Sequence, residues 1–429
     1  MGAALSLSSV AMAETTELTI ATVNNGDMVR MQKLSNEFEA KNPDIKLNWV
    51  TLEENVLRQK VTTDIATKGG QYDVITIGTY EVPIWAKKEW LFALDGLGSD
   101  YDIDDLLPKI RASLSSDGKL YAAPFYGESS FTMYRKDLFE KAGLTMPEDP
   151  TWDFIKEAAG KITDKANEVY GICLRGKAGW GENMAFLAAM ANSYGGRWFD
   201  EGWKPQFDQP EWKATLTDYV ELLKNDGPPG ASSNGFNENL ALFNSGKCGM
   251  WIDATVAASF VTNPKESKVA DNVGFALAPQ KGLGKNANWI WSWALAVPAG
   301  SLKVDAAQKF IAWATSKEYT ELVASKEGWA NVPPGTRKSL YDNAEYTSAA
   351  PFAKLTIESI NRADPEHPTV KPVPYVGVTF PSIPEYPGIG TTVGQTFSAV
   401  VAGSLSVDQA LDQAQQSTTR EMTKAGYLK

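Results

Sequence analysis

Apolar residues alternate between short strand-like runs and helical spacing along the chain up to residue 80. Short runs rich in β-branched or apolar residues, at 18–23, 45–51 and 72–78, predict strands. Helical spacing separates these runs, at Met31, Leu34 and Phe38 and then at Val56, Leu57, Val61 and Ile65. Because strands alternate with helices, we predict an α/β fold that begins with a parallel, doubly wound sheet.

The carboxyl ends of parallel strands meet at one edge of a sheet, and ligands bind outside that edge in doubly wound folds. The segments that follow the three predicted strands are 24–27, 53 and 78–80. We therefore expect a row of polar and aromatic side chains along one rim, namely Asn24, Asp27, Glu53, Thr79 and Tyr80.

A second series of elements begins at residue 122. Pro124 favours extended backbone before it, 129–134 reads as a strand, and Asp137 can cap a short helix that Gly143 ends. Further strands are predicted at 169–174, 248–252 and 273–279, the last as the return of the chain to the first sheet. Helices are predicted at 152–162, 183–193, 209–223 and 237–245.

The last third of the chain mixes helical and irregular patterns. Trp289, Trp291 and Trp293 alternate with other residues, so all three indoles share one face if the segment is extended. Residues 305–325 predict one long helix, and 391–403 and 407–426 predict two closing helices. The segment 375–387 is rich in proline and aromatic residues, which excludes it from the interior of a sheet.

Length and charge narrow the possible classes of protein. With 429 residues the chain exceeds the size at which one hydrophobic core keeps growing, so two lobes are expected. The net charge of −11, without any basic block, argues against nucleic acid and anionic membrane surfaces as partners. Residues 1–13 are small and apolar and end in Ala-Met-Ala, which indicates the remnant of a secretory signal peptide and a periplasmic location; a disordered N-terminus is the alternative.

The residues that could hold a metal are few. Cys173 and Cys248 are compatible with a disulfide in an oxidising compartment and equally with two buried thiols. With His367 as the only histidine, they cannot form a structural zinc site, and we expect neither metal nor cofactor. Asp100–Asp105 alternates like a calcium loop, but Leu106 stands where a turning glycine is needed, so we predict a helix N-terminus there.

Several short sequence motifs occur along the chain in the same order as in a known protein family. Residues 134–143, Tyr-Arg-Lys-Asp-Leu-Phe-Glu-Lys-Ala-Gly, are the most specific; others are 37–43, 72–74, 307–313, 332–337 and 403–411. This set resembles the bacterial extracellular solute-binding proteins of carbohydrate ABC importers, which are similar to maltose-binding protein. Within that family, the segment Trp-Ile-Trp-Ser-Trp-Ala-Leu-Ala-Val-Pro and the loop 175–180 look most like the sorbitol- and mannitol-binding members.

The resemblance implies a two-lobed clam shell, each lobe a mostly parallel sheet flanked by helices, joined by a hinge of several chain crossings that closes on a ligand. We place the N-terminal lobe at 14–124 plus 280–335 and the C-terminal lobe at 125–279 plus 336–429. The implied protein is a monomeric periplasmic receptor rather than an enzyme. It binds a polyol such as mannitol, sorbitol or a pentitol and delivers it to the membrane permease of an ABC importer.

A polyol presents many hydroxyl groups on a thin carbon chain, so its site needs bidentate polar groups and flat aromatic walls. Candidate polar anchors are Asp27, Glu53, Glu128, Arg175 and Asp253, with Asn24 and Thr79 as weaker contacts; candidate walls are Tyr80, Tyr126, Trp180, Trp289 and Trp291. Alternating tryptophans are often core residues, and we expect Trp293 to be the buried one because it continues into Ala-Leu-Ala-Val.

Other functions stay open at this point. A mono- or disaccharide in place of a polyol fits the same residue types. A secreted glycoside hydrolase that uses two carboxylates is a second alternative, and a structural or adhesion module a third. The chain contains no G-x-S-x-G, H-E-x-x-H or P-loop motif. His367 lies in Asp-Pro-Glu-His-Pro, which is not part of a recognisable catalytic motif.

Overall fold

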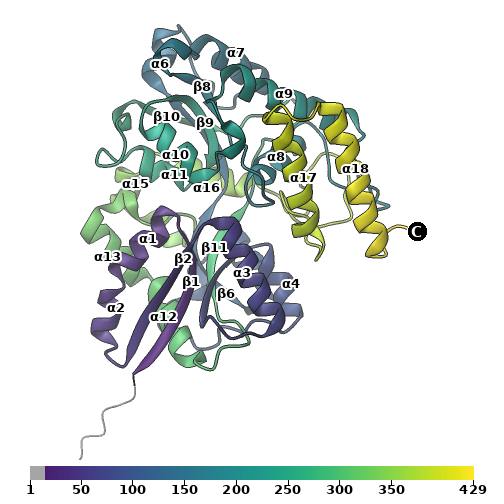
Figure 1. Ribbon diagram of the computed structural model, residues 1–429. Coiled ribbons are helices and arrows are strands. Elements are labelled where there is room, and N and C mark those ends of the chain that lie inside the picture. The colour runs from purple at the N-terminus through teal and green to yellow at the C-terminus, as the bar shows by residue number, and fades with distance from the viewer. Residues whose placement is uncertain (1–14) are drawn as a thin grey trace, which may run out of the picture.

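The computed structural model describes residues 15–429 and has two lobes, each built on its own sheet (Figure 1). The predicted signal-peptide remnant, 1–13, lies outside the described residues. The first sheet has the strand order β2-β1-β3-β11-β6 and the second β10-β7-β9-β8. Their bounds are β1 Thr16–Val23, β2 Ile45–Leu52, β3 Val74–Gly78, β6 Ala122–Glu128, β7 Ser130–Arg135, β8 Tyr170–Cys173, β9 Cys248–Ala254, β10 Val273–Leu277 and β11 Trp291–Ala296.

Both sheets are mixed. In the first, β1 is parallel to β2 and β3, whereas β11 is antiparallel to β3 and β6. The reason is the path of the chain: β6 leaves this lobe toward the hinge and β11 re-enters it, so they run in opposite directions side by side. In the second sheet β8 is parallel to β9, but β7 is antiparallel to β9 and β10. The expectation of mostly parallel sheets therefore holds for β1–β3 and not for the second lobe.

Helices pack around both sheets (Figure 1). Around the first sheet lie α1 Gly26–Leu34, α2 Asn36–Lys41, α3 Glu54–Thr67, α4 Glu81–Lys87, α5 Pro108–Ser113, α12 Val304–Ala314 and α13 Lys317–Glu327. The second lobe has α6 Lys136–Lys141, α7 Trp152–Ile162, α8 Asn183–Ser193, α9 Pro210–Asp226, α10 Phe236–Asn244, α11 Ala257–Val261 and α16 Ala353–Arg362. The short helices α14 Lys338–Asp342 and α15 Ala344–Ala349 precede α16, and the closing helices α17 Tyr386–Val401 and α18 Val407–Lys424 pack against α8 and α9.

One predicted strand and one predicted helix differ from the structure, the strand in its sheet and the helix in its continuity. Residues 273–277 form β10, which pairs with β7 in the second sheet; the return to the first sheet is made by β11 instead. The single helix predicted at 305–325 is two helices, because the Ser316 hydroxyl accepts a hydrogen bond from the Tyr319 N–H at 3.0 Å and caps α13.

Three helix starts also differ from the prediction. Helix α6 begins after Arg135, and Asp137 does not cap it, because its carboxylate accepts from the Arg135 guanidinium at 2.7 Å. Helix α17 begins at Tyr386, within the proline-rich tail, since proline is tolerated in the first turn. The acidic stretch forms two 3₁₀ turns, 99–101 and 103–105, and the helix itself starts at Pro108.

The boundaries of the lobes stay a prediction. Strand β6 pairs within the first sheet up to Glu128, which faces Trp291, and β7 opens the second sheet at Ser130. The first crossing between the sheets is therefore at Ser129, a little beyond the expected end of the N-terminal segment at 124.

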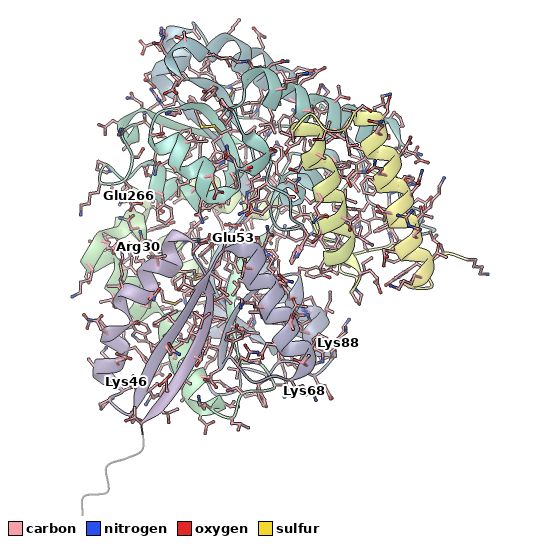
Figure 2. All side chains as sticks on the ribbon, in the orientation of Figure 1. Arg30, Lys46, Glu53, Lys68, Lys88 and Glu266 are labelled. Atoms are coloured by element: carbon pink, nitrogen blue, oxygen red, sulfur yellow. A yellow bond between two sulfur atoms is a disulfide. The ribbon has the colours of Figure 1, made fainter. Side chains whose placement is uncertain are left out.

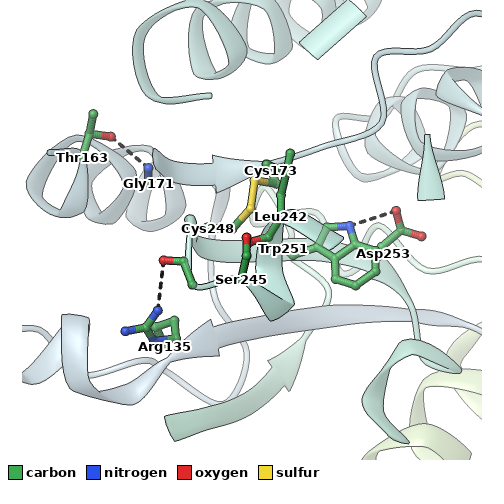
Figure 3. Close-up of a disulfide and its surroundings, with 10 residues drawn as sticks. Arg135, Thr163, Gly171, Cys173, Leu242, Ser245, Cys248, Trp251 and Asp253 are labelled. Atoms are coloured by element: carbon green, nitrogen blue, oxygen red, sulfur yellow. Dashed lines mark hydrogen bonds between the residues drawn. A yellow bond between two sulfur atoms is a disulfide. The ribbon is translucent and has the colours of Figure 1, made fainter. Parts of the chain in front are cut away.

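A disulfide joins the edge strand β8 to its neighbour β9 in the second lobe. Cys173, the last residue of β8, is bonded to Cys248, the first of β9, with their Cα atoms 5.8 Å apart (Figure 3). This pairing decides between the two alternatives that the sequence left open. Among residues 15–429, no helix combines the length and apolar character that a membrane crossing requires.

Candidate ligand-binding site

A cavity lies between the two sheets, where about 440 Å³ of space, part of it open to solvent, is not filled by protein atoms. Its walls come from both lobes and from the segment before α17. They consist of Asn25, Glu54, Arg58, Tyr126, Glu128, Arg175, Gly181, Ala185, Phe236, Ala254, Val256, Trp289, Trp291, Trp293, Thr379 and Phe380.

Sheet topology explains why these residues meet. In the first sheet β1, β2 and β6 all run toward the second lobe, and β11 starts from it. The carboxyl ends of the first three strands deliver Asn25, Glu54 and Glu128, and the amino end of β11 delivers Trp291. Trp291 packs so closely on Gly78 that a Cβ there would lie 2.0 Å from the indole, so only glycine fits at the end of β3.

Arg58 on α3 is held from several sides. Its Nε and Nη2 donate to Glu54 Oε1 at 3.0 and 2.8 Å, and its Nη1 donates to Glu81 at 2.8 Å. Its guanidinium carbon lies 4.7 and 4.9 Å from the ring centroids of Trp293 and Trp291. Because a guanidinium has five N–H groups, one on each Nη stays available to a ligand.

Arg175 occupies the corresponding place in the second lobe. Its Nε and Nη2 donate to the Asp253 carboxylate at 2.7–3.1 Å, and its Nη1 donates to the Gly181 carbonyl at 3.1 Å. Asp253 is fully buried and also accepts from Trp251 Nε1 at 3.1 Å (Figure 3). Burial by itself lowers the pKa of Arg175, but the charge and hydrogen bonds of Asp253, together with the charges of Glu182 and Glu54, raise that pKa overall, so the guanidinium stays charged. It too keeps one N–H on each Nη for a ligand.

The walls between the arginines are aromatic. The Arg175 guanidinium carbon lies 5.8 Å from the Trp289 ring and 5.3 Å from the Phe236 ring. Asn25 Nδ2 donates to the Tyr126 hydroxyl at 3.0 Å, which leaves the phenolic hydrogen free to bond a ligand. Flat rings of this kind suit the carbon chain of a polyhydroxylated molecule.

Glu128 faces the cavity without a charged partner of its own. It is 5 % exposed and forms no ion pair within residues 15–429, and the Trp289 side chain is its hydrogen-bonding neighbour. Burial raises the pKa of Glu128 to about 8, against the opposing effect of Arg175 and with a further rise from Asp253 and Glu54. At neutral pH the carboxyl group is therefore protonated and can both donate and accept a hydrogen bond.

The lobes touch across the mouth of the cavity. Glu53 caps α3 and forms a 2.6 Å ion pair with Lys177 of the second lobe; Figure 2 shows Glu53 at the edge of the first lobe that faces the second. Asn55 Nδ2 donates to the Ala178 carbonyl at 3.2 Å, and Asn237 Nδ2 donates to Asn24 Oδ1 at 3.2 Å. These contacts hold the two lobes in a closed arrangement.

Ten of the twelve residues expected at the site fall into three groups. Tyr126, Glu128, Arg175, Trp289 and Trp291 line the cavity. Asp253, Trp180 and Tyr80 stand behind it, and Asn24 and Glu53 form contacts between the lobes.

The other two lie elsewhere. Asp27 is buried in an ion pair with Arg30, next to Glu327, and Thr79 lines a separate groove. Burial, only partly opposed by Arg30, raises the pKa of Asp27 to about 6. Neither side chain reaches the cavity.

Sequence reasoning missed several lining residues. Asn25, Glu54 and Arg58 come one or a few positions after predicted rim residues, and the signal that could have found Arg58 is its place one helical turn after Glu54. Trp293, expected to be the buried indole, is buried at 3 % exposure, and it also lines the cavity beside Trp291, because alternate residues of a strand share a face. Phe236, Thr379 and Phe380 carry no local signal, since only tertiary packing brings them here.

Metal binding finds no support in the described part of the chain. No group of three or more His, Cys, Asp or Glu side chains in residues 15–429 is placed to hold a metal ion. The acidic side chains of the cavity instead face guanidinium groups.

Comparison with known proteins agrees with this architecture. The profile of the bacterial extracellular solute-binding protein family matches residues 25–321. The mannitol-binding protein of Pseudomonas aeruginosa is 61% identical over 412 residues, covering 96% of this chain and 94% of that protein.

Solved structures show the same fold. A solute-binding protein of an ABC transporter from Agrobacterium vitis, crystallised with bound D-mannitol, is 75% identical with a TM-score of 0.96 over 97% of this chain and all of that one. One from Agrobacterium radiobacter in complex with ribitol is 27% identical, with a TM-score of 0.83 over 95% of this chain and 99% of that one. The predicted two-lobed α/β fold is thereby confirmed.

Proposed function

Because this chain belongs to the bacterial extracellular solute-binding protein family, we propose that it is the D-mannitol receptor of an ABC importer and that it holds mannitol in the cavity between its lobes. Proteins of this kind bind and release a solute unchanged, so the chain is a receptor and not an enzyme. The identity of two relatives that are named for mannitol or crystallised with it supports the choice of ligand.

The observation that carries the proposal is the pairing of Arg58 and Arg175 across the cavity. Each guanidinium is fixed by a carboxylate of its own lobe, Glu54 or Asp253, and each keeps free N–H groups. Vicinal hydroxyls of an alditol offer adjacent oxygen acceptors that such forked donors match. Since both arginines already have internal counter-charges, a neutral ligand leaves no charge uncompensated.

Acceptors for the ligand's hydroxyl hydrogens are also at hand. Glu54 Oε1 is occupied by Arg58, which leaves Glu54 Oε2 as an acceptor, and Glu128 adds the oxygens of a cavity carboxyl group that forms no ion pair within residues 15–429. We propose that the ligand contacts Arg58, Arg175, Glu54, Glu128 and Tyr126 directly and stacks its carbon chain on Trp289, Trp291 and Trp293. Asp253, Trp180 and Tyr80 then act as supports.

The energetics are consistent with a tight receptor. Hydrogen bonds to charged groups contribute about 1.5–3 kcal/mol each, and a micromolar Kd corresponds to about 8 kcal/mol. A few such bonds together with the aromatic walls are therefore sufficient, after the cost of association is subtracted.

Delivery to a permease and a periplasmic location complete the proposal. The family consists of extracellular binding proteins, and the Cys173–Cys248 disulfide suits an oxidising compartment. We propose that the closed, liganded monomer is the form that the membrane subunits recognise.

Isothermal titration calorimetry with a panel of D-mannitol, D-sorbitol, ribitol, D-glucose and maltose tests the ligand. We expect one mannitol per chain, bound more tightly than the sugars. Analysis of the ligand after incubation should recover it unchanged, and hydrolysis of a glycoside under the same conditions would instead favour the glycosidase alternative. Absence of binding to every polyol in the panel would overturn the proposal.

A further inference from the structure

The ligand cavity shares one wall with a second, larger cavity. This outer groove is open to solvent, with about 1750 Å³ of space in and above it; it runs between α4, α5 and the segment 374–383 and is lined by Thr79, Tyr80 and Ile383 among others. Thr379 and Phe380 line both the ligand cavity and the outer groove. These two residues are therefore the partition between them.

The Phe380 ring is the larger of the two side chains that separate the ligand cavity from the outer groove. Its centroid lies 5.5 Å from Trp291, a wall of the ligand cavity, and 6.5 Å from Tyr80, a wall of the outer groove. A T-shaped contact of 5.1 Å with Trp180 packs it from a third side. With 9 % of its surface exposed, the ring is enclosed by these neighbours.

The backbone that carries Phe380 is tied down on both sides. Asn192 Nδ2 donates to the Val378 carbonyl at 2.6 Å, and the Tyr80 hydroxyl donates to the Ile383 carbonyl at 2.7 Å. Between them the Ser382 N–H donates to the Val376 carbonyl at 2.9 Å. In this closed arrangement the segment is bonded to both lobes, which holds the partition in place.

We propose that Phe380 sets the length of the ligand: it closes one end of the site, and its truncation would open the site into the outer groove, where a glycosyl group attached to the alditol would fit. This inference rests on the proposed function, since it takes the ligand to be an alditol. It identifies a specificity-determining residue that excludes alditols glycosylated at the end that faces Phe380.

The outer groove has the chemistry to receive a sugar ring. Trp203 and Tyr375 supply aromatic faces, and Lys109 and Asp364 supply a donor and an acceptor. The Lys109 ammonium is already held by the carbonyls of Asn361 and Ala363 at 2.6 and 2.5 Å, so this wall is ordered before any ligand arrives.

Calorimetric titration with D-mannitol and with 1-O-α-D-glucopyranosyl-D-mannitol tests the inference on the wild type, F380A and F380L. We expect the wild type to bind mannitol and reject the glucosylated form. F380A should bind the glucosylated form at least about tenfold more tightly than the wild type does, with weakened binding of mannitol. F380L, which keeps a branched apolar side chain in the wall, should show a smaller gain, and it replaces F380A if the alanine variant does not fold.

A matched control separates opening of the wall from general loosening of the core. Phe352 is a buried aromatic residue, 2 % exposed, that packs on Phe275 away from both cavities. F352A should keep the wild-type ligand preference. Failure of the wild type to bind mannitol would overturn the proposed function. Mannitol binding by folded F380A or F380L without any gain for the glucosylated form, or strong binding of that form by the wild type, would overturn this inference alone.

Discussion

The guanidinium carbon of Arg58 lies 3.9 Å from the ring centroid of Trp180, which belongs to the opposite lobe. Arg58 comes from α3 beside the first sheet, and Trp180 comes from the loop after β8 in the second. The stack therefore exists only when the lobes are closed. A cation–π contact of this kind contributes about 0.5–2 kcal/mol, depending on how far it is desolvated.

Replacement of Trp180 by alanine is expected to weaken mannitol binding by about 2- to 30-fold, although Trp180 does not line the cavity. The reason is that the variant loses a contact formed on closure. Calorimetry measures the change. W90A is the matched control, since Trp90 stacks with Lys88 at 4.6 Å far from the cavity; equal losses in the two variants would contradict the role given to Trp180.

Removal of the charge of Asp253 is expected to damage both stability and binding. Asp253→Asn leaves the buried Arg175 without its counter-ion, and breaking a buried ion pair costs about 3–5 kcal/mol. Urea unfolding should report this loss, and calorimetry should show weaker mannitol binding. Glu318→Gln breaks an exposed pair with Lys41 and should change stability by less than about 0.5 kcal/mol. A D253N protein as stable as the wild type would contradict the account.

The stability of the protein is expected to fall as pH rises from about 5 toward 8. Burial raises the pKa of Glu128 from 4.5 to about 8, so the folded protein holds a proton there that the unfolded chain has released. The stabilisation is complete below the unfolded pKa and is lost as pH rises through the folded pKa.

Comparison with Glu128→Gln isolates this effect. The glutamine variant keeps the shape but cannot ionise, so its free energy of unfolding should fall less between pH 5 and 8 than that of the wild type. Urea unfolding at several pH values measures both slopes. Glu182, whose pKa burial and Glu54 also raise to about 8, contributes equally to both proteins and cancels in the comparison. Identical slopes would mean that Glu128 is ionised in the folded state.

Loss of the ion pair at the mouth is expected to speed ligand release. Lys177→Met removes the 2.6 Å pair with Glu53, and with it a longer 3.7 Å contact with Glu182, while leaving the Glu53 cap of α3 in place. Both side chains are partly exposed, and pairs of this type contribute about 0–1 kcal/mol, so the dissociation rate should rise by at most about fivefold.

Stopped-flow tryptophan fluorescence measures that rate. Lys247→Met is the control, because Lys247 pairs with Glu168 at 3.0 Å within the second lobe. The effect of K177M should shrink at high salt, since screening weakens the wild-type pair. A release rate that K177M leaves unchanged at low salt would remove the pair from the mechanism of closure.

The sequence predicts the strands and helices near the start of the chain better than it predicts which of their side chains reach the cavity. The rim at the ends of β1 and β2 follows from strand–helix alternation, and Asn25 and Glu54 do lie there, next to the residues named in advance. The side chains one position away, Asn24 and Glu53, point to the other lobe instead. Periodicity cannot resolve a difference of one residue where a strand gives way to a helix.

Other site residues lie beyond local patterns. Phe380 belongs to a segment without regular structure, and its place depends on hydrogen bonds from Asn192 and Tyr80, which are far away in sequence. Asp253 looks like a ligand anchor in the sequence, but burial with Arg175 makes it a support. Conversely, the shared face of Trp291 and Trp293 follows from alternation, and Trp293 is both buried, as expected, and part of the cavity wall.

A crystal structure of the protein grown with D-mannitol tests the central claim most directly. The account predicts one mannitol molecule between Arg58 and Arg175, with its hydroxyls bonded to Glu54 and Glu128 and its carbon chain against the tryptophan wall. Mannitol bound elsewhere, or a cavity without mannitol at saturating concentration, would contradict it.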